Sequence, residues 1–133
     1  MLFRSDFSKS LRILVAEDVV PSRMLLTMML ENLGHHVTAA ENGLDALQAA
    51  HETAFDLILM DLQMPEMDGF EATKRILALA PQMPIIGQTA HALPEDRDRC
   101  LAAGMVDHIA KPINLTLLLE LVLKYARRGN RAN

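Results

Sequence analysis

The sequence predicts an α/β fold in which helices cover both faces of a five-stranded parallel sheet. Short runs rich in Ile, Val and Leu recur along the chain, with the length and composition of strands buried on both faces. Segments with apolar residues at helical spacing alternate with these runs, which is the order of repeated β-α units. The expected strands are residues 11–16, 36–40, 55–60, 85–88 and 106–110.

Residues that favour helix ends separate the expected helices from the strands. Pro21 suits the first turn of a helix, where its missing N–H costs nothing, and Gly34 favours the end of that helix. Asn42 begins a turn before the second helix, Asn114 caps the last helix, and Gly129 is expected past its end. The strand at 55–60 is the most apolar, which predicts a central position in the sheet. The expected helices are residues 22–34, 44–52, 71–80, 94–103 and 115–128.

Length and composition indicate one globular domain. The chain has 133 residues, of which 50% are hydrophobic and 23% charged, so we expect a buried core and no extended disorder. We assign residues 11–127 to the domain, 1–10 to a lead-in or linker, and 128–133 to a C-terminal tail. The net charge of −4 argues against nucleic-acid binding, which favours a basic face.

Two further observations concern the cellular compartment. No apolar stretch reaches the ~20 residues that span a bilayer, and the N-terminus lacks the features of a signal peptide. The single cysteine, Cys100, excludes an internal disulfide and fits a reducing compartment. We therefore expect a cytoplasmic domain without membrane contact, in a parent chain that could itself be membrane-anchored.

Acidic side chains follow two of the expected strands. Glu17 and Asp18 come directly after residues 11–16, and Asp61 comes directly after 55–60. Ligands of open α/β sheets bind outside the carboxyl ends of the strands, so these acids should meet at one edge. An isolated acidic pair can also cap a helix, but three clustered carboxylates repel one another unless a cation binds. The pattern favours Mg²⁺, which binds one or two carboxylates and leaves room for a phosphate.

Asp61 is the candidate nucleophile, because a carboxylate can attack phosphorus to form an aspartyl phosphate. Thr89 and Lys111 follow the last two strands, and they could donate hydrogen bonds to a phosphoryl oxygen. Taken singly, the lysine could be solvated and the threonine could bond its own turn. The bond between Lys111 and Pro112 is a candidate cis peptide, which would turn the chain sharply.

These residues lie in four stretches that resemble the response-regulator receiver domain. The stretches are ILVAED, DLILMDLQMPEMDGFEAT, PIIGQTA and AKP, and the resemblance covers residues 11–126. The sequence spacings between Asp18, Asp61, Thr89 and Lys111 also fit that family. The resemblance implies a flavodoxin-like fold, a doubly wound parallel sheet with strand order 2-1-3-4-5 and five helices.

The resemblance also implies a role for each residue. Asp61 matches the phosphoacceptor, Asp18 the acid that binds Mg²⁺ directly, and Glu17 the acid that acts through a water. The backbone carbonyl of Gln63 matches a further metal ligand. Lys111 matches the lysine that pairs with the phosphate, and Thr89 matches the switch hydroxyl.

Three positions are expected to tune this chemistry. His108 stands where the family often has Tyr or Phe, and it is either a switch residue or an exposed histidine at a strand end. His91 and Gln63 each lie two residues after a site residue, Thr89 and Asp61 respectively. We expect them to set the lifetime of the phosphate.

The resemblance implies a phosphoryl donor, either a histidine kinase or a histidine phosphotransfer domain. It also implies self-phosphorylation and autodephosphorylation, and a possible homodimer through the fourth helix, fifth strand and fifth helix. The sequence is most like the receivers of hybrid sensor histidine kinases. A stand-alone response regulator and an unphosphorylated docking domain are alternatives. A Mg²⁺-dependent phosphohydrolase is another, although it needs a second acid where this chain has Gln63.

Overall fold

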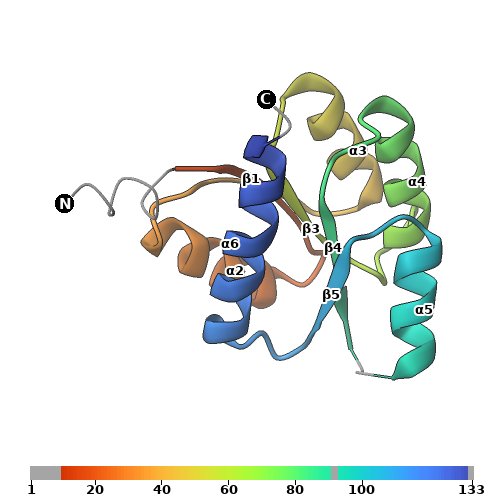
Figure 1. Ribbon diagram of the computed structural model, residues 1–133. Coiled ribbons are helices and arrows are strands. Elements are labelled where there is room, and N and C mark those ends of the chain that lie inside the picture. The colour runs from red at the N-terminus through yellow and green to blue at the C-terminus, as the bar shows by residue number, and fades with distance from the viewer. Residues whose placement is uncertain (1–9, 91–92, 132–133) are drawn as a thin grey trace.

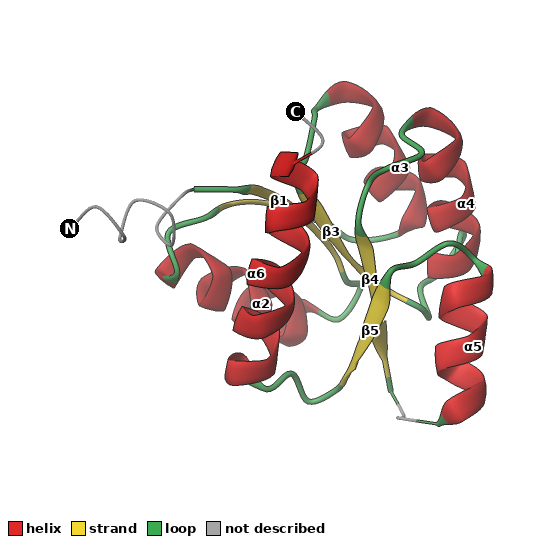
Figure 2. Cartoon of the chain, in the orientation of Figure 1, coloured by secondary structure: helices red, strands yellow, loops and turns green. Residues whose placement is uncertain are grey.

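The computed structural model describes residues 10–90 and 93–131, with side chains up to Tyr125. Strands and helices alternate along this part of the chain (Figure 1), and Figure 2 shows the strands gathered between the helices. The strands are β1 (Arg12–Ala16), β2 (His36–Ala40), β3 (Leu57–Asp61), β4 (Ile85–Thr89) and β5 (Asp107–Ala110). The helices are α2 (Val20–Asn32), α3 (Gly43–Glu52), α4 (Gly69–Leu79), α5 (Pro94–Ala102) and α6 (Leu115–Arg131).

The strands form one parallel sheet in the order β2-β1-β3-β4-β5, as predicted. The most apolar strand, β3, lies at the centre, and all of its residues are buried. In the register of the sheet, Asp61 pairs with Gln88, and Thr89 pairs with Ala110. The last residues of neighbouring strands therefore lie side by side at the carboxyl edge of the sheet.

Helices cover both faces of the sheet, with α2 and α6 on one face and α3, α4 and α5 on the other (Figure 1). Alternate strand residues point to opposite faces, and this divides the core into two clusters. Leu57 and Leu59 join the cluster under α2 and α6, whereas Ile58 and Met60 join the other. By this alternation, Asp61 lies on the α2 and α6 side, as does its neighbour Gln88.

Asn114 caps α6 as predicted, and Asn42, predicted as a turn residue, caps α3. The Asn42 Oδ1 atom accepts a hydrogen bond from the Asp45 amide at 2.8 Å, and the Asn114 Oδ1 atom accepts one from the Leu117 amide at 2.9 Å. Gly129, however, lies inside α6, which continues to Arg131. One glycine costs a helix only about 1 kcal/mol relative to alanine, so it does not end the helix by itself. Among the described residues, none of the helices combines the length and apolar content needed to cross a membrane.

Candidate functional site

The carboxyl edge of the sheet brings together the residues that the sequence singles out. Glu17 and Asp18 follow β1, Asp61 ends β3, Thr89 ends β4, and Lys111 follows β5. All of these residues except the fully buried Glu17 line a cleft of about 710 Å³. Its lining consists of Asp18, Val19, Asp61, Leu62, Gln63, Met64, Asp68, Phe70, Gln88, Thr89, Ala90, Asp96, Arg99 and Lys111.

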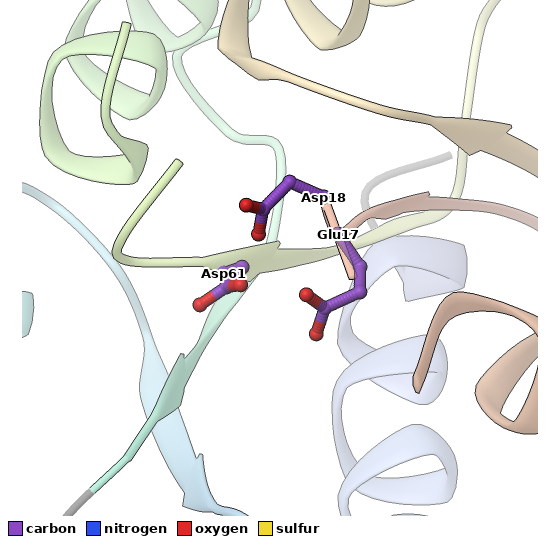
Figure 3. A group of neighbouring side chains, drawn as sticks. All are labelled: Glu17, Asp18 and Asp61. Carbon is purple, nitrogen blue, oxygen red and sulfur yellow. The ribbon is translucent and has the colours of Figure 1, made fainter. Parts of the chain in front are cut away.

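Glu17, Asp18 and Asp61 form an acid cluster (Figure 3). One carboxylate oxygen from each lies within 4.8 Å of the others, so the three could hold a metal ion. Glu17 and Asp61 are buried, and Asp18 is half-buried at the cleft. Oxygen ligands in this number suit a hard divalent cation.

Lys111 connects two members of the acid cluster. Its Nζ donates a hydrogen bond to Asp61 Oδ2 at 3.1 Å and forms an ion pair with Glu17 Oε1 at 2.7 Å. The peptide bond from Lys111 to Pro112 is cis. A cation on a flexible chain can move from carboxylate to phosphoryl oxygen, which is the property expected of this lysine.

The ionisable groups of the cluster shift each other's pKa. Burial, together with contact with the Glu17 carboxylate, raises the pKa of Asp61 from 3.8 to about 6. Burial also opposes ionisation of Glu17, but hydrogen bonding to Asp61 and Lys111 outweighs it and lowers the pKa of Glu17. Burial acts against the charge of Lys111, yet its two acidic partners keep its pKa above the ordinary value. Of these two carboxyl groups, Asp61 therefore has the higher pKa.

The turn between β1 and α2 is held by a residue that sequence reasoning missed. The guanidinium of Arg23 donates a hydrogen bond from Nη1 to the carbonyl of Glu17 at 2.9 Å, and a longer one to the carbonyl of Asp18 at 3.5 Å. On the other side of the turn, the Glu17 amide donates to the carbonyl of Ala40 at 3.0 Å. The Val19 amide donates to Glu17 Oε2 at 3.1 Å, which fixes that side chain.

The loop between β3 and α4 packs tightly under Asp61. A Cβ atom on Gly69 would lie 2.1 Å from the carbonyl oxygen of Asp61, so only glycine fits here. The Gly69 amide donates to the carbonyl of Leu62 at 3.0 Å, which closes the loop. Gln63 is exposed and lines the cleft, and its amide lies 3.4 Å from Asp61 Oδ1 as a weak donor.

The end of β4 differs, because its polar side chains are buried without partners. Within the described residues, Thr89 Oγ1 and Gln88 Nε2 have no hydrogen-bond partner, although each residue is only 1% exposed. Sequence reasoning selected Thr89 and missed Gln88. The only signal was an amide at a position where a buried strand normally carries an apolar side chain.

His108 lies on β5 beside Asp107. Its amide donates to Asp107 Oδ1 at 2.8 Å, and its buried Nδ1 atom lies 3.8 Å from the same oxygen without a hydrogen-bond partner in the described residues. The Tyr125 hydroxyl of α6 donates to Asp107 Oδ2 at 2.9 Å and so ties α6 to β5. His108 is half-buried, which leaves both of its expected roles open. His91, the other histidine expected to tune the site, lies outside the described residues.

Comparison with known proteins identifies the family. Residues 13–123 match the response regulator receiver domain. Sensor histidine kinase RcsC of Salmonella typhimurium is 39% identical over 124 residues, which are 93% of this chain and 13% of that protein. The chain therefore spans about an eighth of the length of this relative.

Two solved structures resemble the fold closely. The receiver domain of sensor histidine kinase PA1611 from Pseudomonas aeruginosa, which has a magnesium ion in its active site cleft, is 36% identical with a TM-score of 0.83. The match covers 90% of this chain and 99% of that chain. A chain from the complex of the Saccharomyces cerevisiae histidine phosphotransfer protein Ypd1 with the receiver domain of Ssk1 is 28% identical with a TM-score of 0.84, covering 89% of this chain and 90% of that chain.

The family match and the parallel sheet agree with the clustering of acids, threonine and lysine at one edge. The chain belongs to the response regulator receiver domain family of two-component signalling proteins.

Proposed function

We propose that this domain accepts a phosphoryl group from a phosphohistidine onto Asp61, with Mg²⁺ bound beside it, and then changes its own surface. The observation that carries the proposal is the position of Lys111 Nζ, 3.1 Å from Asp61 Oδ2 and 2.7 Å from Glu17 Oε1. An acid cluster paired with a mobile cation beside a cleft is suited to binding a phosphoryl group.

Glu17, Asp18 and Asp61 would hold the Mg²⁺, Glu17 through a water, with the backbone carbonyl of Gln63 as a further ligand. The fit rests on their carboxylate oxygens, which lie within 4.8 Å of one another. Burial and contact with the Glu17 carboxylate, which raise the pKa of Asp61, also favour a cation beside it. When bound, the ion screens the repulsion between the Asp61 carboxylate and the anionic donor.

Asp61 acts as the nucleophile in this proposal. One carboxylate oxygen forms a bond to phosphorus while the bond from phosphorus to the donor imidazole nitrogen breaks, and its electron pair returns to the imidazole. The product is an acyl phosphate on Asp61. In its hydrolysis a water oxygen bonds to phosphorus while the bond from phosphorus to the Asp61 oxygen breaks, so inorganic phosphate leaves and the carboxylate is regenerated, with the water protons passing to phosphate and solvent.

Lys111 and Thr89 respond to the new phosphoryl group. Lys111 exchanges a carboxylate partner for a phosphoryl oxygen, and the buried Thr89 hydroxyl donates to another. The absence of a partner for Thr89 Oγ1 among the described residues supports this step, since the hydroxyl would gain a hydrogen bond on phosphorylation. The shift of Thr89 would favour one of two pre-existing arrangements of the surface near α5, β5 and α6. His108, on β5, is a switch candidate on the same path.

The donor would be a histidine kinase or a histidine phosphotransfer domain. Val20, Met24 and Met28 recur every four residues on α2, and each is more than half exposed. They form an apolar stripe on the helix that begins beside the cleft, and such a stripe suits docking against the apolar face of helices in a partner. The yeast complex of a phosphotransfer protein with a receiver supports this class of partner.

The surrounding protein would be a hybrid sensor histidine kinase. The similarity to RcsC supports this context, because this chain matches 13% of that kinase. A stand-alone response regulator is the alternative, and the full reading frame distinguishes the two.

The test is phosphoryl transfer to Asp61→Asn from a radiolabelled histidine phosphotransfer domain in Mg²⁺. We expect at least a roughly 1000-fold loss of labelling, because the amide cannot act as the nucleophile. Asp98→Asn, a change to an exposed aspartate of α5, is the matched control and should label normally. Equal labelling of Asp61→Asn and the control would refute the assignment of Asp61.

A further inference from the structure

Arg23 lies in the first turn of α2 and reaches back over the preceding turn. Its Nη1 atom donates to the Glu17 carbonyl at 2.9 Å and lies 3.5 Å from the Asp18 carbonyl. Its Nη2 atom forms a 3.5 Å ion pair with Glu41, which follows β2. The Arg23 side chain is only 14% exposed, whereas that of Glu41 is 70% exposed. The strongest contact of this mostly buried cation is therefore with the backbone next to the acid cluster.

The contact leaves the carboxylates of Glu17 and Asp18 available for a metal ion. An arginine paired directly with these carboxylates would compete with a bound cation, but Arg23 bonds their carbonyl oxygens instead. Backbone carbonyls at a strand end need donors when they are buried, and a charged donor forms a stronger hydrogen bond than a neutral one.

Asp18 depends on this contact more than Glu17 does. The Glu17 side chain is fixed by the Val19 amide and by Lys111. In the described part of the chain, the Asp18 carboxylate has no hydrogen-bond or ion-pair partner. Its direction is thus set by the backbone turn alone, and repulsion from Glu17 and Asp61 would tend to push it outward.

We propose that Arg23 is a positioning residue for the metal site. By holding the carbonyls of Glu17 and Asp18, it keeps the turn in the conformation that points both carboxylates at Asp61, and it thereby sets the affinity for Mg²⁺. The inference about Mg²⁺ rests on the proposed function, whereas the inference about the turn does not.

The principal test replaces Arg23 by methionine, which keeps the aliphatic chain and removes the guanidinium. Calorimetric titration with Mg²⁺ should give a Kd about tenfold higher than wild type, as is common when a group that orients metal ligands is lost. Phosphoryl uptake at saturating Mg²⁺ should stay within about twofold of wild type, because Arg23 does not contact the reacting atoms. Arg75→Met is the matched control: Arg75 pairs with Glu71 on the exposed surface of α4, and its loss should leave the Kd unchanged.

A second readout needs no metal. Amide hydrogen exchange of Glu17 and Val19 in metal-free protein should be about tenfold faster in Arg23→Met. The Val19 amide bonds Glu17 Oε2 within the held turn, and the Glu17 amide joins the turn to the Ala40 carbonyl of β2, so both bonds open when the turn loosens. Glu41→Gln should change neither readout by more than about twofold, since the Glu41 ion pair is exposed and the carbonyl contacts remain.

The outcomes separate the two proposals. A wild-type protein that binds no Mg²⁺ refutes the proposed metal site, and hydrogen exchange then still decides the role of Arg23 in the turn. A folded Arg23→Met with wild-type Kd and wild-type exchange overturns the inference. If Arg23→Met does not fold, Arg23→Lys takes its place. The lysine side chain can bond only one of the two carbonyls well, so the Kd of this variant for Mg²⁺ should be about threefold higher than that of wild type. An unchanged Kd would overturn the inference.

Discussion

The strands that supply the acids differ from the strands that supply the threonine in how their polar groups are satisfied. On the acid side, Glu17 is held through its amide, its carbonyl and Oε2, and Asp61 bonds Lys111. Glu17 Oε1 accepts no hydrogen bond but has an ion pair with Lys111, and the Asp18 carboxylate, which has no partner among the described residues, is half-buried at the cleft. On the β4 side, Thr89 Oγ1 and Gln88 Nε2 are buried without partners among the described residues.

This difference indicates that the two sides of the site have different roles, one in binding and the other in the change that follows binding. A site that binds a cation and a phosphoryl group gains from groups that are already in place, since little order has to be created on binding. A group that responds needs an alternative arrangement of similar free energy, and a buried hydroxyl without a partner destabilises the resting arrangement. The acid side is therefore suited to binding and the β4 side to switching.

The largest expected effect is on the free energy of unfolding. It is tested by substituting one glycine beside the acids, Gly69, and one on β4, Gly87. In Gly69→Ala the new Cβ would lie 2.1 Å from the backbone of Asp61 and 2.9 Å from that of Leu62, so the loop must move. We expect the free energy of unfolding to fall by about 4 kcal/mol. In Gly87→Ala the nearest atoms are the sulfurs of Met105 and Cys100, at 2.8 and 3.0 Å. These side chains can shift, so the loss should be about 1–2 kcal/mol. Urea unfolding measures the free energy of unfolding of both variants. Equal decreases in the two variants would contradict the view that the acid side is the more rigid one.

The next effect tests the contribution of Lys111 in the absence of metal. Lys111→Met leaves Glu17 and Asp61 without their cation, and we expect the free energy of unfolding to fall by about 2–3 kcal/mol in Mg²⁺-free buffer. Lys74→Met, at an exposed position of α4, serves as the control and should change stability by less than about 0.5 kcal/mol. A similar small change in both variants would mean that Lys111 is not part of the acid cluster in solution.

A third test uses the raised pKa of Asp61. Because this pKa is about 6 in the folded protein and 3.8 ordinarily, the group stabilises the fold below pH 3.8, and this contribution is lost as pH rises through about 6. Without Mg²⁺, the free energy of unfolding of the wild-type protein, relative to that of Asp61→Asn, should therefore fall by about 2 kcal/mol between pH 4 and pH 7.5. Urea unfolding at several pH values gives the difference. A difference that is constant with pH would show that folding does not raise the pKa of Asp61, and a difference of the opposite sign would show that folding lowers this pKa.

The smallest effect concerns the unpartnered hydroxyl of Thr89. Thr89→Val keeps the shape and removes the buried polar atom, so the unphosphorylated protein should become more stable by up to about 1 kcal/mol. Thr89→Ser keeps the hydroxyl and loses a methyl group, so it should be less stable than wild type by about 1 kcal/mol. Thermal unfolding of the two variants checks the order, and a destabilised Thr89→Val would indicate that the hydroxyl has a partner in solution.

The sequence was sufficient to predict the sheet and the convergence of its polar groups. In a parallel sheet every strand ends at the same edge, so residues such as Asp61 and Thr89 can be placed together from their position after apolar runs. The ends of the elements were less predictable. Gly129 lies inside α6 because a local preference of about 1 kcal/mol is easily outweighed.

Arg23 and Gln88 could not be placed from the sequence. A long side chain such as that of Arg23 can point to solvent or turn back onto the preceding backbone, and the sequence does not distinguish these directions. Gln88 follows apolar residues of its strand, but nothing in the sequence indicates whether its amide finds a partner. The contacts of both residues depend on atoms from other strands and loops.

Lys111 pairs with two of the three clustered carboxylates, and this imbalance of charge has a consequence for the order of events. In the proposed function the donor is itself an anion, so before any divalent ion arrives it would meet a net negative field at the mouth of the cleft. Cation and donor should thus load sequentially, the ion first. At low ionic strength, a fall in the supply of divalent ions would silence the domain even when donors are abundant.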